Sequence, residues 1–169
     1  HVDLDRQKVE EMIQLNVTTL TELCSLFGQK MKKKRKGYIL NVASTAAYQP
    51  TPYTTVYGAT KSYVLNFSEA LAKELEDYNV VVTCLSPGPT DTNFFDEFGV
   101  EGLHEIKKGV WEKSNLMDSR EVAEIGVNAL FAKKLSLIAG NWNSLLAFSN
   151  RLAPRSTAAS ISKKVMRQS

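Results

Sequence analysis

The chain has 169 residues, of which 43% are hydrophobic and 23% are charged, and its formal net charge is +3. This length and composition are typical of one compact domain with its own core, and they exclude a disordered or fibrous chain. No apolar run reaches the roughly 20 residues that a membrane-spanning helix needs.

The first predicted element is a long helix over residues 3–35, where apolar side chains recur at helical spacing until Gly37 ends it. A buried strand is predicted for 38–44, which reads "YILNVAS", and a proline-containing loop follows it. Residues 57–78 return to helical periodicity. A second, strongly β-branched strand is predicted for 80–85.

Residues 87–117 contain no clear strand, and a segment of that length in a compact domain is usually a lid or a binding loop. A capping-box pattern at Asp118 and Glu121 opens the next helix. A third strand is predicted for 135–140. The last part, 141–169, is predicted to be a helical tail that is rich in basic residues.

Helices that alternate with fully apolar strands predict a parallel sheet covered on both faces, with right-handed crossovers. The predicted fold class is therefore α/β, a partial doubly wound (Rossmann-like) parallel sheet of about three strands with covering helices. Its domain comprises residues 1–140, including the lid at 87–117, and the tail follows at 141–169. Three strands make a thin sheet, so the chain looks like part of a larger doubly wound fold.

Tyr57 and Lys61 lie four residues apart, which places both side chains on one face of the predicted helix. The tyrosine pKa of about 10 is too high for a general base near neutrality, and an adjacent ammonium lowers it. Such a pair can exchange a proton with a substrate oxygen. Because both residue types are common, the pair alone also fits two ordinary polar side chains on a helix.

Further polar residues stand where predicted strands end or where an apolar pattern is interrupted. Ser44 ends the first strand, at the edge where α/β sheets bind ligands, and its hydroxyl either orients a substrate carbonyl or makes a turn. Asn16 interrupts the apolar positions of the first helix, so its amide needs a partner in a local kink or a polar network. Thr90 and Thr92 follow the second strand within "SPGPTDT", where a cofactor would lie.

Together these residues resemble the short-chain dehydrogenase/reductase superfamily over residues 1–140. The spacings of the family's catalytic tetrad, 28, 13 and 4 residues, separate Asn16, Ser44, Tyr57 and Lys61. The segment "SPGPTDT" resembles the family's Pro-Gly nicotinamide loop. The resemblance implies an NAD(P)-dependent oxidoreductase that reduces a carbonyl or oxidises an alcohol, with no metal.

The resemblance also implies a role for each residue. Ser44 would hold the substrate carbonyl, and Tyr57 would be the general acid or base. Lys61 would lower the pKa of Tyr57 and bind the nicotinamide ribose, and Asn16 would hold a proton-relay water. The cofactor, NADP or NAD, would contact Tyr57, Lys61, Pro87, Gly88, Thr90 and Thr92.

The family begins with a strand and a glycine-rich turn that binds the pyrophosphate, and nothing in this sequence resembles that turn. We therefore expect the chain to be the C-terminal part of the family fold, with little activity in isolation. The first strand would then have an unpaired inner edge. The alternatives are a truncated product that folds or dimerises without turnover, and a member of the sugar-nucleotide epimerase branch.

The lid candidate carries aromatic side chains that fit an apolar carbonyl or alcohol substrate or, equally, the packing of the lid itself. They are Phe94, Phe95, Phe98 and Trp111. The resemblance implies a homodimer or homotetramer formed through the helices at 3–35 and 57–78.

Basic residues gather at 30–36, where they fit a solvated helix end, and in the tail; we expect no nucleic-acid partner. The tail also has apolar residues, for which packing against the core or a partner subunit is favoured over contact with a membrane surface. These are Trp142, Leu145, Leu146 and Phe148.

Cys24 and Cys84 lie in apolar patterns that favour buried free thiols over a disulfide, so we expect a cytoplasmic protein.

Overall fold

A computed structural model of the chain describes residues 5–92, 116–150 and 152–167. Its strands form one parallel sheet in the order β1-β2-β3. They are β1 (Gly37–Val42), β2 (Val80–Ser86) and β3 (Ser136–Ile138). The predicted three-stranded parallel α/β sheet is therefore confirmed. The edge of β1 that faces away from β2, which is the inner edge named in the sequence prediction, pairs with no strand in the described part of the chain.

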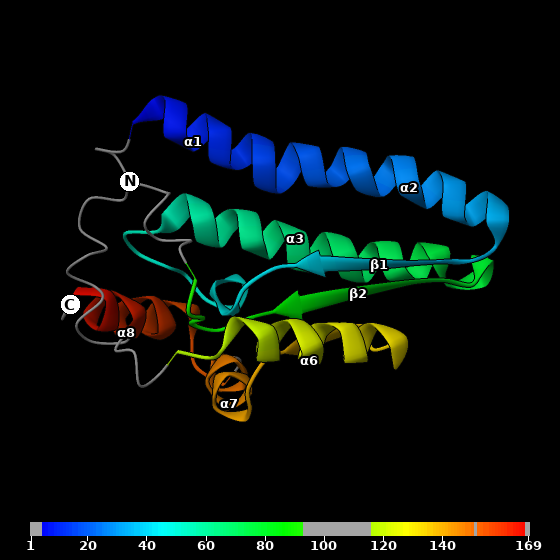
Figure 1. Cartoon of the computed structure of the whole chain (residues 1–169). Helices are drawn as coiled ribbons and strands as arrows, with labels where there is room; N and C mark the ends of the chain where they lie inside the picture. Colours follow the sequence, from blue (N-terminus) through cyan, green and yellow to red (C-terminus); the bar gives the residue numbers. More distant parts are fainter. Residues whose placement is uncertain (1–4, 93–115, 151, 168–169) are drawn as a thin grey trace.

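Helices cover both faces of this sheet (Figure 1). One face carries a long helical rod and α3, and the other face carries α6 (Figure 1). The rod consists of α1 (Arg6–Ile13), the π-helical turn η1 (Gln14–Thr19) and α2 (Leu20–Lys34). The other two are α3 (Thr55–Leu75), continued by the 3-10 turn η3 (Glu76–Tyr78), and α6 (Ser119–Phe131).

The long first helix is confirmed and ends within one residue of the predicted position, but the predicted role of Gly37 in ending it is wrong. The helix ends at Lys34 because Arg35 adopts a left-handed conformation, with φ of 49°. Gly37 is already the first residue of β1. There its α-carbon packs directly against the Met31 side chain and leaves no room for a Cβ atom. Gly37 therefore allows α2 and β1 to pack closely together and does not end the helix.

The core lies on both faces of β2, because successive side chains of a strand point to opposite faces. Val82 and Cys84 pack toward α3, and Leu85 packs with Val122 of α6. A Cβ atom on Gly126 would lie 2.6 Å from Leu85, so α6 sits very close to the sheet. Cys24 and Cys84 are both buried free thiols, as predicted.

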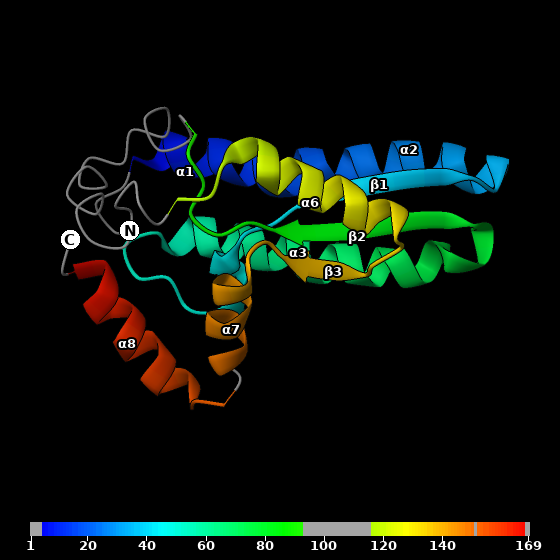
Figure 2. The ribbon, with the colours of Figure 1, turned by 60° about the horizontal axis from the view of Figure 1, so that its bottom comes forward.

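Helices α7 (Asn141–Ser149) and α8 (Arg155–Arg167) lie within the predicted tail and are separated at Pro154. Both helices lie toward the carboxyl ends of the strands (Figure 2). The four apolar residues of the tail are all exposed, so the expected packing against the core is wrong, whereas packing against a partner subunit stays a prediction. Ala147 is the buried residue of α7. No helix in the described ranges is both long and apolar enough to cross a membrane.

Candidate active site

The four predicted catalytic residues come from three elements that meet where β1 ends. Tyr57 and Lys61 stand in the first two turns of α3, Ser44 lies just after β1, and Asn16 lies in η1 of the rod. These elements pack together, since α3 contacts η1, β1 and the short helix η2 (Thr45–Tyr48). The site therefore forms only when these three separate segments of the chain pack together correctly.

Ser44 has two hydrogen bonds that fix its position. Its backbone is extended, and its hydroxyl oxygen accepts the backbone N–H of Ala46 at 3.1 Å, which starts η2. A side-chain hydrogen bond also joins Ser44 to the hydroxyl of Tyr57. The serine is thus a turn residue, as one of the two interpretations of the sequence expected, and it is also a direct partner of the tyrosine.

The Tyr57 hydroxyl differs electrostatically from what the sequence suggested. Burial raises its pKa above the usual 10.0, and the hydrogen bond from Ser44 only partly opposes this effect. The expected lowering by Lys61 is therefore not the net effect here. The Lys61 Nζ atom lies 5.7 Å from the centre of the Tyr57 ring.

Lys61 is half-buried between α3 and the end of β1. Its Nζ atom donates a hydrogen bond to the backbone carbonyl of Val42 at 3.0 Å. Burial lowers the lysine pKa below its usual 10.5, because desolvation disfavours the ammonium form. Val42 is the last residue of β1, so the strand's carboxyl end itself holds the lysine beside the tyrosine.

Asn16 sits in the π-helical turn, which explains why an amide interrupts the apolar stripe. Its Nδ2 atom donates to the Thr60 hydroxyl at 3.1 Å, and that hydroxyl in turn donates to the Tyr57 backbone carbonyl at 2.8 Å. Of the two alternatives, the polar network is present, because this π-helical turn joins a hydrogen-bonded chain. Such turns often mark functional sites. Sequence reasoning missed Thr60, although it immediately precedes Lys61.

The loop after β2 lies against the same end of the sheet. The Pro87 carbonyl accepts the backbone N–H of Thr45 at 2.8 Å, which ties this loop to η2. The Thr90 hydroxyl donates to the Gly88 carbonyl at 2.9 Å, whereas Thr92 is exposed. Thr90 also forms a parallel bridge with Met117, so the two ends of the predicted lid lie side by side.

A residue from α7 also reaches this loop. Gly88 packs so closely against the Asn143 carboxamide that no Cβ atom would fit. Asn143 is held there because its Nδ2 atom donates to the Ala139 carbonyl at 2.8 Å. The sequence carried no signal for this contact, since it joins residues 55 positions apart. The lid aromatics Phe94, Phe95, Phe98 and Trp111 lie outside the described residues.

The donor set at this end of the sheet fits the nicotinamide-ribose half of NAD(P). An ammonium, a phenol and threonine hydroxyls suit ribose hydroxyls and a carboxamide. The described residues contain no glycine-rich turn at a helix N-terminus that would fit the pyrophosphate. In the same ranges no group of three or more histidine, cysteine or acidic residues could hold a metal ion.

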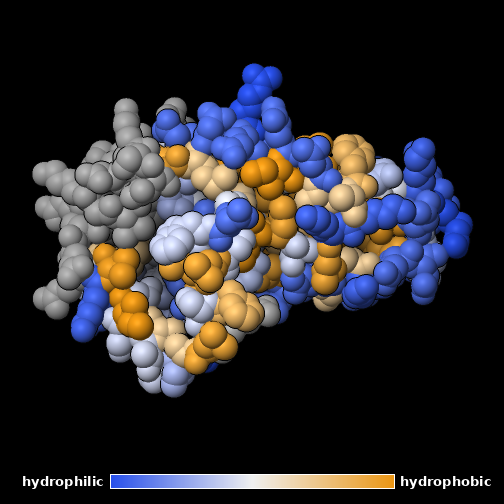
Figure 3. Space-filling view, turned by 90° about the horizontal axis from the view of Figure 1, so that it is seen from below, coloured by the Kyte–Doolittle hydropathy of each residue, from blue (hydrophilic) through white to orange (hydrophobic). Residues whose placement is uncertain are grey.

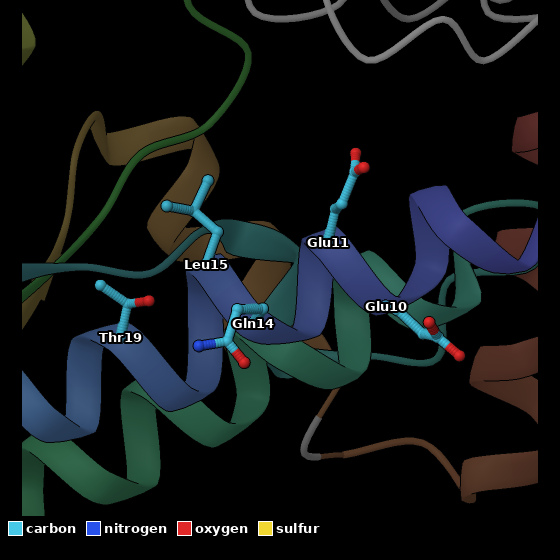
Figure 4. A pocket seen from close by; sticks show the side chains of 5 residues that line it. All are labelled: Glu10, Glu11, Gln14, Leu15 and Thr19. Carbon is cyan, nitrogen blue, oxygen red and sulfur yellow. The ribbon is translucent and has the colours of Figure 1, made fainter.

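A shallow depression on the molecule lies away from these residues. It follows the exposed side of the rod, across α1 and η1 (Figure 4). Its lining consists of Glu10, Glu11, Gln14, Leu15 and Thr19. Since none of the four predicted catalytic residues lines it, this depression contributes nothing to the candidate active site.

Comparison with known proteins gives consistent matches. Residues 1–101 match the family model described as short chain dehydrogenase. A 3-oxoacyl-[acyl-carrier-protein] reductase FabG of Chlamydia muridarum is 31% identical over 110 residues, which cover 65% of this chain and 42% of the relative. The 17-beta-hydroxysteroid dehydrogenase type 3 of Mus musculus is 36% identical over 78 residues, which cover 46% of this chain and 26% of the relative.

Solved structures match over most of the chain. A short-chain dehydrogenase from Sphingobium yanoikuyae in complex with NADPH has a TM-score of 0.72 and 25% identity, covering 90% of this chain and 58% of that one. A 7beta-hydroxysteroid dehydrogenase has a TM-score of 0.77 and 23% identity, covering 95% and 61%, and shows the same fold. The chain spans less than two thirds of the length of each of these proteins.

Proposed function

The chain belongs to the short-chain dehydrogenase family, and from this premise we propose that it is part of an NAD(P)-dependent oxidoreductase that reduces a carbonyl or oxidises an alcohol. The observation that carries the proposal is the hydrogen bond between Ser44 and Tyr57, with the Lys61 ammonium 5.7 Å from the tyrosine ring. Because the chain covers only part of its relatives, we propose little turnover for the 169 residues in isolation.

In this proposal Tyr57 transfers the proton. Its raised pKa keeps the hydroxyl protonated at neutral pH, which suits a general acid that protonates the oxygen of a carbonyl substrate. When a substrate binds, the single O–H of Ser44 would turn from the Tyr57 hydroxyl to the substrate oxygen and orient it. The nicotinamide cofactor, when bound, supplies or accepts the hydride.

Lys61 has two tasks in the proposed reaction. Its positive charge favours the phenolate that forms as Tyr57 gives up its proton. An ammonium has three N–H donors, and one of them goes to the Val42 carbonyl, so the others can bind the ribose hydroxyls. Pro87, Gly88 and the hydroxyls of Thr90 and Thr92 would contact the rest of the nicotinamide half. The choice between NADP and NAD stays open.

Asn16 is proposed to hold the proton-relay water from its position in η1. Its Nδ2 atom is committed to Thr60, so its side-chain oxygen would accept from that water. The hydrogen-bonded chain from Asn16 through Thr60 to the Tyr57 carbonyl keeps the rod and α3 in register. An aromatic lid with Phe94, Phe95, Phe98 and Trp111 would favour an apolar carbonyl or alcohol.

The outer face of the rod supports the proposed homodimer or homotetramer. Exposed apolar side chains follow this face and continue onto α3, as expected of helices that pack against a second copy. They include Leu23, Leu26 and Phe27 on α2 and Tyr63 on α3. Buried free thiols at Cys24 and Cys84 support a cytoplasmic location, where thiols stay reduced.

The test of the proposed chemistry is Tyr57→Phe in the protein that carries this chain. Turnover of a carbonyl substrate should fall about 10²- to 10⁴-fold, because the proton donor is lost. Nicotinamide fluorescence should show that the cofactor still binds. Tyr63→Phe on the same helix is the matched control, since its hydroxyl bonds to Thr21 and not to the site. Undiminished turnover in Tyr57→Phe would overturn the proposed function.

A further inference from the structure

The outer face of α7 is apolar and exposed, which is unusual for a surface helix. The helix contains no charged residue. The exposed fractions are 69% for Trp142, 57% for Leu145, 47% for Leu146, 57% for Phe148 and 77% for Leu152 in the turn that follows. We call these five residues the α7 apolar face. Hydrophobic atoms gather over α7 and α8 when the molecule is viewed from below (Figure 3).

Helix α8 beside it is amphipathic. Ala158 and Ser162 are buried against the molecule, while Ile161 is exposed by 56% and extends the apolar surface. Lys163 and Lys164 are exposed on another side of the same helix. The helix therefore presents both apolar and cationic side chains to its surroundings.

The charge of this whole region has one sign. Residues 125–169 contain no aspartate or glutamate. Its basic residues are Lys133, Lys134, Arg151, Arg155, Lys163, Lys164 and Arg167. The α7 apolar face and α8 therefore belong to a stretch of the chain whose charged residues are all basic, which favours an anionic partner with an apolar interior.

We propose that the α7 apolar face and α8 bind the surface of a lipid bilayer that contains anionic headgroups. Leucine and phenylalanine side chains would enter the boundary between headgroups and acyl chains, and Trp142 would sit at the headgroup level, which tryptophan prefers. The lysines of α8 would meet the negative surface potential of the leaflet. This interaction is independent of the catalytic proposal.

A second copy of the chain fits this surface less well. Pairing two copies through the α7 apolar face would bring two regions without any acidic residue together, and like charges across an interface are unfavourable. A bilayer with anionic lipids instead complements both the apolar and the cationic component. Charge complementarity therefore decides between the two occupants.

Trp142 provides a direct probe. The chain has two tryptophans, so Trp111→Phe leaves Trp142 as the sole emitter. We expect its emission to shift to shorter wavelength, and the chain to co-sediment, with vesicles of phosphatidylcholine and phosphatidylglycerol. Vesicles of phosphatidylcholine alone should bind much more weakly. If the anionic vesicles cause no shift in emission and the chain does not co-sediment with them, the proposal is overturned.

Paired variants test the two components separately. Each basic residue near an anionic surface strengthens binding about fivefold, so Lys163→Gln/Lys164→Gln should weaken vesicle binding roughly 25-fold. The matched control is Lys33→Gln/Lys34→Gln, an exposed lysine pair on α2, which lies across the molecule from α7 (Figure 1). Equal losses in both pairs would overturn the assignment to α8.

The apolar component is tested by Leu145→Ser/Leu146→Ser. Both leucines are exposed, so the variant should fold, and it should lose vesicle binding while its mass in solution stays the same. The alternative outcome is that light scattering shows a lower mass in solution for the variant and that the unsubstituted chain does not bind vesicles. In that case a second copy occupies the α7 apolar face, and the proposal is wrong.

Discussion

Helices α3 and α7 differ in where their side chains find their contacts. Along α3, polar side chains find partners within the chain: Thr60 bonds to Asn16, and Ser68 bonds to Asn41 of β1 at 2.9 Å. Along α7, large apolar side chains face outward and the small Ala147 faces inward. The comparison teaches that the described chain provides the partners of polar side chains on α3, whereas it leaves the large apolar side chains of α7 exposed.

The largest effect on turnover is expected from Lys61→Gln, which removes the positive charge that α3 places beside Tyr57. Turnover should fall at least about a hundredfold, because the developing phenolate loses its cation. The measurement is the steady-state rate with a carbonyl substrate, together with cofactor affinity. Lys73→Gln, at the exposed end of the same helix, is the control and should leave both unchanged. Similar turnover rates for the two variants would contradict the proposed role of the Lys61 charge beside Tyr57.

Cys84 gives the next largest effect, through pH. Burial raises its pKa from 9.0 to about 11, so the folded state keeps a proton that the unfolded state loses. The unfolded state is therefore favoured progressively as the pH rises from 9.0 to about 11, and below 9.0 the thiol has no effect on the pH dependence. The shift corresponds to about 2 to 3 kcal/mol.

Urea unfolding of Cys84→Ala and of the unsubstituted chain at several pH values measures this contribution. The variant should be less stable at neutral pH, because a buried side chain is truncated, but its stability should fall less steeply above pH 9. Parallel curves for the two chains would show that Cys84 does not carry the alkaline loss.

Thr60→Val should have a smaller effect. The change keeps the shape of the side chain but removes the hydroxyl that accepts from Asn16 and donates to the Tyr57 carbonyl. We expect about 1 kcal/mol lower stability and a reduced kcat with unchanged cofactor affinity. Thr60→Ser keeps the hydroxyl and should restore kcat. A serine variant as impaired as the valine variant would place the effect in packing rather than in the hydrogen bond.

The smallest effect is expected on the exposed side of α7. Leu145→Ser should change the free energy of unfolding by no more than about 0.5 kcal/mol, because the side chain is already exposed. Ala147→Leu, on the buried side of the same helix, should destabilise the chain by about 1 to 3 kcal/mol through overpacking. Chemical denaturation compares the two. A large loss for Leu145→Ser would mean that the α7 apolar face is covered within the chain.

Much of the site was predictable because it depends on spacing along the chain. Tyr57 and Lys61 lie on one helical face wherever that helix packs, and Ser44 follows an apolar run that forms a strand in any parallel sheet. The π-helical form of η1 was not predictable, because a single extra residue in a turn barely changes an apolar periodicity. The asparagine's partner lies 44 residues away. No local pattern specifies such a contact.

The sequence by itself determined the order of helices and strands, the family resemblance and the spacing of the four residues proposed as a catalytic tetrad. Those features rest on short-range periodicity and on intervals that folding does not change. Only the tertiary structure decided that burial raises the pKa of Tyr57, that Asn143 packs against Gly88, and that α7 turns its apolar residues outward. Burial, desolvation and exposure depend on which distant segments pack together, and amino-acid spacing carries no record of that.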